Sequence, residues 1–152
     1  NNGYACIMEI IRPLLQEIYQ DKPWQMLVCC ILLNLTHRRQ VDKVRDELFE
    51  KWPTPEKMME ADEKELSTLL KPLGFYNKRA KTLIKMSRQW VTNDPVWIHV
   101  GDLHGIGNYA MDSWEIFQMD NIPLLEHVDA VEDKVLKQYI KEYWNENNNQ
   151  VH

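Results

Sequence analysis

Cysteine is scarce in the sequence, and the spacing of the few cysteines excludes two common uses. The 152 residues include three cysteines, Cys6, Cys29 and Cys30. They do not have the spacing of a metal-binding motif, and an iron–sulfur cluster needs four cysteine ligands, so this chain alone does not supply enough. Cys29 and Cys30 stand in an apolar run. We interpret all three as reduced core thiols, and we expect neither a metal nor another cofactor.

Long apolar segments are also absent. No uninterrupted apolar run approaches the roughly 18 residues that a membrane-spanning helix needs, and no secretory hydrophobic region is present. We therefore expect an intracellular protein that does not bind membranes. It is expected in the nucleus of a eukaryotic host, or in the cytoplasm of a bacterial or viral one.

Alternation of apolar and polar residues, the pattern of a half-buried strand, does not occur in the sequence. Apolar residues instead recur at helical spacing, which predicts an all-α fold of about eight to ten helices. Thr54 and Asp62 are expected N-caps, because such side chains accept hydrogen bonds from unpaired helix amides. The segments expected to be helical are Ile7 to about Tyr19, Trp24 to Leu33, Val41 to near Trp52, a short helix from Pro55, Asp62 to Lys71, about Asn77 to Val91, Ala110 to Phe117, and a final helix with Leu136 to Trp144.

Acidic residues are unevenly distributed, and none occurs between Glu65 and Asp94. The net charge of −5 argues against a nucleic-acid partner, yet residues 112–146 hold nine acidic and three basic residues, whereas residues 1–111 have a net charge of +1. Positions 78, 81, 85 and 88 share one helical face, which is either a solvated surface or a flank for DNA. The basic residues of the acid-free interval are Lys71, Lys78, Arg79, Lys81, Lys85 and Arg88.

Two of the five glycines stand close together in Leu103-His104-Gly105-Ile106-Gly107-Asn108-Tyr109-Ala110. This stretch predicts a small hairpin followed at once by a helix, with the first helix amides facing outward. Such amides bind anions, because a helix N-terminus carries partial positive charge and glycine has no Cβ to keep a phosphate away. The stretch is therefore either an ordinary turn before a helix or a site for a DNA backbone phosphate.

Several short segments along nearly the whole chain resemble one family. They are Gln16-Glu17, Pro23-Trp24, Leu33-Asn34, Leu69 to Gly74, Arg79 to Thr82, Leu103 to Gly107, Glu132-Asp133 and Trp144. The sequence thereby resembles the helix-hairpin-helix (HhH-GPD) DNA glycosylases, and among them the glycosylase domain of the methyl-CpG-binding thymine glycosylases. The resemblance implies a compact helical fold with a DNA-binding groove. It also implies a single domain over residues 1–152, on its own or as the catalytic part of a longer protein.

The activity implied by the resemblance is removal of thymine or uracil opposite guanine in base excision repair. The implied partner is double-stranded DNA with a mismatched or damaged base, bound by a monomer. Members flip a nucleotide out of the duplex and break its N-glycosidic bond through a cationic sugar, which a carboxylate stabilises. Two other readings stay open at this point. They are a glycosylase for another damaged or modified base, and a non-catalytic DNA-binding module.

Two aspartates before the final helix are candidates for that carboxylate. Asp133 is the expected catalytic residue, because Glu132-Asp133 matches the thymine glycosylase pattern. Asp129 is the alternative, because Val128-Asp129 resembles the Val-Asp dipeptide of other members. An acid before a helix is ordinarily an N-cap, so at least one of the two is expected to be only that.

The resemblance also implies roles for residues outside the aspartate pair. Tyr109 stands where bifunctional relatives have a lysine, so no strand cleavage by Schiff-base chemistry is expected. Gln16 and Tyr109 are expected to form the base pocket. Phe75 aligns with an apolar wedge, and Leu35 replaces an arginine that fills the gap left by the flipped base. The residues expected to contact DNA are Leu35, Arg38, Phe75, Leu103, Gly105, Gly107 and Lys134.

Overall fold

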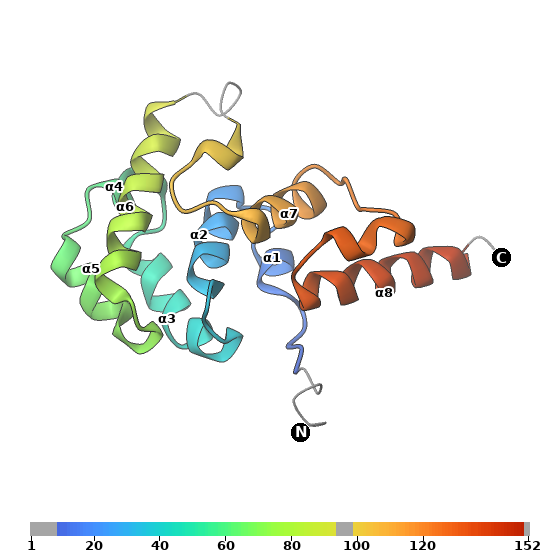
Figure 1. Cartoon of the computed structure of the whole chain (residues 1–152). Helices are drawn as coiled ribbons and strands as arrows, with labels where there is room; N and C mark the ends of the chain where they lie inside the picture. Colours follow the sequence, from blue (N-terminus) through green and yellow to red (C-terminus); the bar gives the residue numbers. More distant parts are fainter. Residues whose placement is uncertain (1–8, 94–98, 151–152) are drawn as a thin grey trace.

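All secondary structure in residues 9–93 and 99–150, the part that the computed structural model describes, is helical (Figure 1). The all-α prediction is thus confirmed for these residues. None of their helices combines the length and apolar character that crossing a bilayer requires. The elements are α1 (Leu15–Ile18), α2 (Pro23–Leu33), α3 (Arg38–Lys51), α4 (Pro55–Met59), α5 (Glu63–Leu70), the 3-10 helix η2 (Lys71–Leu73), α6 (Tyr76–Thr92), the 3-10 helix η3 (Val100–Asp102), α7 (Asn108–Phe117), the 3-10 helix η4 (Leu125–Ala130) and α8 (Lys134–Gln150).

Helix α2 lies at the centre of the fold, as its apolar sequence predicts. Every residue from Trp24 to Leu32 is buried, and Pro23 occupies the first turn, where its missing N–H has no helical partner to lose. The helix contacts α1, α3, α6 and α7. Figure 1 shows α3 to α6 on one side of α2 and α7, η4 and α8 on the other. Burial of α2 therefore joins the two groups of helices into one core.

The N-terminal helix is shorter than predicted. A helix was expected from Ile7 to about Tyr19, but α1 spans Leu15–Ile18, and residues 9–14 are not helical; Ile7 lies outside the described residues. Pro13 explains the error. Proline has no N–H for the helix ladder, its ring clashes with the preceding turn, and it disfavours helical geometry at the residue before it.

The caps expected for the short helices are present. The side chain of Thr54 accepts a hydrogen bond from the amide of Lys57 at 3.2 Å, which starts α4. Asp62 accepts from the amide of Glu65 at 2.9 Å, which starts α5. The carboxylate of Glu65 does not complete a capping box, because it faces the ammonium of Lys51 at 3.4 Å. Each cap satisfies an amide that the helix itself leaves unpaired.

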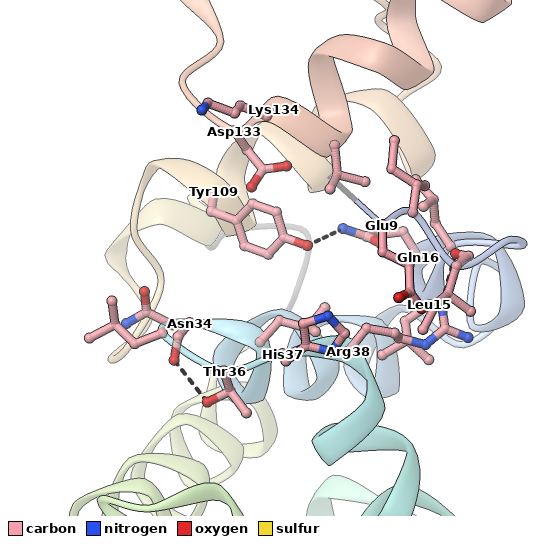
Figure 2. Close-up of a pocket in the computed structure, with 16 residues that line it drawn as sticks. Glu9, Leu15, Gln16, Asn34, Thr36, His37, Arg38, Tyr109, Asp133 and Lys134 are labelled. Atoms are coloured by element: carbon pink, nitrogen blue, oxygen red, sulfur yellow. Dashed lines mark hydrogen bonds between the residues drawn. The ribbon is translucent and has the colours of Figure 1, made fainter. Parts of the chain in front are cut away.

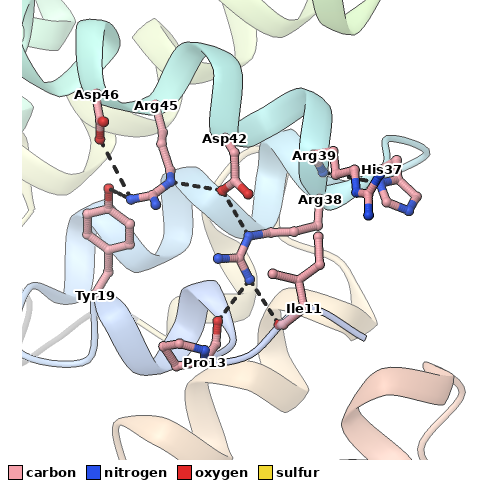
Figure 3. A network of polar contacts seen from close by, with 9 residues as sticks. All are labelled: Ile11, Pro13, Tyr19, His37, Arg38, Arg39, Asp42, Arg45 and Asp46. Atoms are coloured by element: carbon pink, nitrogen blue, oxygen red, sulfur yellow. Dashed lines mark hydrogen bonds and ion pairs between the residues drawn. The ribbon is translucent and has the colours of Figure 1, made fainter. Parts of the chain in front are cut away.

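A polar network holds the non-helical segment before α1 against α3 (Figure 3). Nε of Arg38 donates to the carboxylate of Asp42 at 2.9 Å, and Nη1 donates to the carbonyls of Ile11 and Pro13 at 3.2 and 2.9 Å. Arg45, two turns along α3, donates to the same Asp42 carboxylate at 2.9 Å. The guanidinium of Arg38 is thus engaged within the protein, so its predicted contact with DNA would compete with these bonds.

Replacing Arg38 by glutamine is expected to affect folding more than DNA binding. Losing charge-assisted bonds to partly exposed acceptors should lower the free energy of unfolding by about 1 kcal/mol and speed hydrogen exchange over residues 11–14. The dependence of DNA affinity on salt should stay unchanged. Lys57→Gln, which removes an exposed lysine of α4, controls for loss of charge. A salt slope reduced by about 1 in Arg38→Gln would show instead that Arg38 binds a phosphate.

Candidate active site

Four segments that are distant in the sequence converge on one cavity of about 700 Å³ (Figure 2). Residues 9–11 and 14–16 line it beside the turn at 33–38 that follows α2. Tyr109 contributes from the first turn of α7, and residues 133–135 contribute from the start of α8. The cavity therefore lies where the C-terminal end of α2 meets the N-terminal ends of α7 and α8.

Asp133 is placed at this cavity, and Asp129 is not. The half-buried Asp133 caps α8, since its Oδ2 accepts a hydrogen bond from the amide of Leu136 at 2.9 Å. Among the described residues its other oxygen, Oδ1, has no hydrogen-bond partner. Asp129 is exposed in η4 and is not part of the cavity lining. Asp133 is thus both an N-cap and the aspartate of the cavity, while its catalytic role stays a prediction.

The side chain of Gln16 joins the base-pocket residues expected from the sequence. Gln16 is 2% exposed, and its Nε2 donates to the hydroxyl of Tyr109 at 2.7 Å and to Oγ of Ser113 at 3.1 Å. Burial raises the pKa of Tyr109, and nearby Cys30 and Asp133 raise it further, so the phenol stays neutral. Ser113 was missed in the sequence, although it follows Tyr109 by four positions and therefore shares its helical face.

Leu35 and Phe75 are large apolar side chains that protrude from turns. Leu35 is 84% exposed and Phe75 is 68% exposed, and both have positive φ angles, 58° and 45°. A turn with apolar residues either packs into the core or is left for a partner, and the structure leaves Phe75 outside. Such exposure combined with left-handed backbone is uncommon for bulky residues. Leu35 also lines the cavity, and insertion of either side chain into DNA stays a prediction.

The two glycines of the hairpin have different surroundings. Gly105 has φ +84°, and a Cβ there would lie 2.5 Å from Cγ2 of Thr82 on α6. Gly107 precedes α7, where no side chain caps the first turn, and a Cβ there would meet nothing within 4 Å. Packing and backbone geometry thus require glycine at position 105, where the sequence predicts a glycine that lets a phosphate approach. Of the two glycines, Gly107 is the one that faces open space. Leu103, also expected to contact DNA, is 4% exposed, so its side chain anchors the hairpin in the core.

The basic residues of α6 divide into an exposed and a buried group. Lys78, Lys81, Lys85 and Arg88 are exposed, which agrees with their shared helical face, whereas Arg79 is buried. The exposed four form a positively charged strip that suits a phosphate backbone.

Lys134 is exposed beside Asp133 at the cavity (Figure 2). Its ammonium therefore adds positive charge at the cavity. The predicted contact of Lys134 with DNA is compatible with this position.

Both cysteines of α2 are buried and free, as interpreted from the sequence; Cys6 lies outside the described residues. Burial raises the pKa of Cys30 to about 12, and burial also raises the pKa of Cys29. Because the thiolate is the nucleophilic form, these thiols are inert core groups.

The sequence as a whole identifies the family. Residues 28–150 match the family described as "HhH-GPD superfamily base excision DNA repair protein", so the chain belongs to this superfamily. Within it, the chain is 39% identical over 104 residues to a methyl-CpG-binding domain protein 4-like protein of Arabidopsis thaliana, covering 68% of this chain and 23% of that protein. It is also 39% identical over 81 residues to a thymine-DNA glycosylase of Aeropyrum pernix, covering 47% of this chain and 36% of that protein.

The fold matches a solved structure, that of a thermostable thymine-DNA glycosylase. The TM-score is 0.57 with 20% identity, and the match covers 71% of this chain and 58% of that one. The likeness confirms the predicted helical glycosylase fold. The chain spans less than two thirds of the length of each of these three relatives.

Gly105→Ala is expected to destabilise the protein by about 2 kcal/mol, because alanine is strained at positive φ and its Cβ would strike Thr82. Urea denaturation measures this loss. Gly107→Ala is the matched control and should change stability by less than about 0.5 kcal/mol. Adding Thr82→Ser, which removes the struck methyl group, should restore part of the loss in Gly105→Ala. Equal stability of the two glycine variants would contradict the packing role of Gly105.

Proposed function

We propose that the protein is a monofunctional DNA glycosylase that excises thymine or uracil opposite guanine. The observation that carries the proposal is the convergence of Asp133, Tyr109 and Gln16 at one cavity. An acidic group, a polar base-reading group and an aromatic ring are what cleavage of a flipped nucleotide needs. Membership of a family of base excision repair proteins supports the same conclusion.

DNA binding is assigned to the surface around the cavity. The uncapped first turn of α7 after Gly107 offers backbone amides to a phosphate, and the exposed basic strip of α6 offers further positive charge to the DNA backbone. Leu35 and Phe75 enter the base stack, and the target nucleotide rotates into the cavity. Extrusion costs a few kcal/mol and is cheapest at a mismatch, which favours mispaired thymine or uracil.

Base recognition is assigned to the amide of Gln16. Its two N–H groups are directed to Tyr109 and Ser113, and no residue in the described part of the chain donates to its carbonyl oxygen. An acceptor at this point matches the N3–H of thymine and uracil, whereas N3 of cytosine is itself an acceptor. A base that leaves a buried polar group unpaired is disfavoured, so the arrangement selects against cytosine.

Bond cleavage is assigned to Asp133. The bond between C1′ and the base nitrogen breaks, its electron pair leaves with the base, and the sugar becomes positively charged. The free oxygen of the Asp133 carboxylate stabilises that charge and accepts a proton as water adds to C1′. Tyr109 has no amine to form a Schiff base, so the product is an intact abasic strand.

A panel of labelled duplexes tests the proposal. Each duplex contains one G·T, G·U or A·U pair and is treated with alkali after incubation to break abasic strands. We expect alkali-dependent cleavage at G·T and G·U. Cleavage without alkali would contradict a monofunctional mechanism and direct attention to Lys134. Release of uracil from A·U as readily as from G·U would contradict a requirement for guanine opposite the target, and no release from any duplex would favour the alternative of a non-catalytic DNA-binding module.

Asp133→Asn is expected to reduce base release by at least about 100-fold, because the neutral amide cannot stabilise the cationic sugar. Asparagine is also a good N-cap, so the start of α8 and the affinity for duplex DNA should be retained. Single-turnover excision and filter binding measure the two properties. Asp129→Asn is the control and should excise at nearly the unmodified rate. Inactivity of Asp129→Asn with an active Asp133→Asn would reverse the assignment.

A further inference from the structure

The guanidinium of Arg79 uses all of its N–H groups inside the protein. Arg79 is 6% exposed, and an arginine has five side-chain N–H donors in a planar fork. The structure supplies five acceptors. Nε donates to the carbonyl of Gly74 at 2.9 Å. Nη1 donates to the carbonyls of Ile31 and Leu32 at 3.3 and 3.2 Å. Nη2 donates to the carbonyl of Asn34 at 2.9 Å and to Oγ1 of Thr36 at 2.5 Å.

Three of these acceptors belong to the two turns that present the exposed apolar side chains, and the carbonyls of Ile31 and Leu32 belong to the end of α2. Asn34 and Thr36 flank Leu35, and Gly74 immediately precedes Phe75. The two turns are about forty residues apart in the sequence. One buried side chain therefore joins both turns and ties them to the carbonyl end of α2.

The charge of Arg79 is balanced without an acid. Among the described residues no carboxylate pairs with it, and burial lowers its pKa. The negative end of the α2 dipole and the turn carbonyls supply the compensation. Because a buried charge is costly unless fully hydrogen-bonded, the side chain has one geometry in which it is satisfied, and that geometry includes both turns.

The backbone at both protruding residues is strained. Leucine and phenylalanine at positive φ are strained, and such conformations persist only where the surroundings fix them. At Leu35 the fixing contacts are those of Asn34 and Thr36 with Arg79. At Phe75 the fixing contact is the hydrogen bond from Arg79 to the carbonyl of the preceding residue, Gly74.

We propose that Arg79 is a positioning residue that holds Leu35 and Phe75 at a fixed separation, so that both enter the DNA base stack together. This inference rests on the proposed function. Arg79 then promotes extrusion of the target nucleotide and takes no part in bond cleavage. Lysine cannot replace it, because an ammonium has three donors and no planar fork.

The test is a mutant cycle measured by single-turnover excision of thymine from a G·T duplex at saturating protein. Arg79→Lys should slow excision by about 10-fold or more, since loss of about 1.4 kcal/mol at the flipping step is enough. In the Leu35→Ala/Phe75→Ala background the same change should cost less than about 2-fold, because the groups it positions are gone. Equal losses in both backgrounds would overturn the positioning role.

Destabilisation is separated from positioning by two further variants. Met58→Ala empties a fully buried position of α4, and it should lower thermal stability while leaving excision at a permissive temperature unchanged. Thr36→Val keeps Arg79 but removes one acceptor, so it should slow excision in the same direction as Arg79→Lys. If Arg79→Lys does not fold, Thr36→Val alone decides, and unchanged excision by it would count against the inference.

Base extrusion is also measured without chemistry. In the Asp133→Asn background, 2-aminopurine beside the target thymine brightens when the thymine leaves the stack, and Arg79→Lys should reduce that signal. If the unmodified protein releases no base and Asp133→Asn does not raise the fluorescence, the proposed function is refuted. If both signals are present and the fluorescence is unchanged after Arg79→Lys in the Asp133→Asn background, only the role of Arg79 is refuted.

Discussion

The burial of α2 from Trp24 to Leu32 is the constraint on which the remaining structure depends. A helix that is apolar on every side is stable only when other helices surround it, and α1, α3, α6 and α7 do so here. Their packing brings the end of α2 against the start of α7 and near the start of α8. Helix termini expose unpaired backbone groups. The packing of the core thus places the end of α2 and the starts of α7 and α8 close together. The unpaired backbone groups at these helix ends can bind charged groups although the backbone carries no net charge.

Most of the fold was predictable from local signals in the sequence. Helical periodicity gave the all-α class, and Thr54 and Asp62 marked helix starts because capping depends on residues three positions apart. The exception is the first helix. The apolar periodicity predicts a helix from Ile7, but Pro13 disfavours helical geometry before Leu15. Leu14 and Leu15 are nevertheless buried, so the pattern identified core residues correctly while assigning them the wrong backbone.

The candidate site was only partly predictable, because its contacts join residues distant in the sequence. Asp129 and Asp133 both precede the last helix, and the path of η4, which places Asp133 rather than Asp129 at the cavity, has no periodic signal. Glycine at position 105 was explained by phosphate approach, whereas its surroundings are those of packing. The buried partners of Arg79 include carbonyls of α2, and no pattern in one sequence reports on carbonyls so far away. The family resemblance identifies candidate site residues in the sequence, whereas the side chains and carbonyls that surround them in space are known only from the structure.

The pairing of Gln16 with Tyr109 and Ser113 is made entirely by side chains of the protein. An amide buried with unused donors would cost about 1–3 kcal/mol, so an unsatisfied pocket would retain whatever polar group first entered it. Because Tyr109 and Ser113 already accept the hydrogen bonds of Gln16, its amide donors do not retain an incoming polar group. Under the proposed function, this arrangement would shorten the residence time on normal nucleotides, so that hydrogen bonds among three side chains would influence how fast ordinary sequence is scanned.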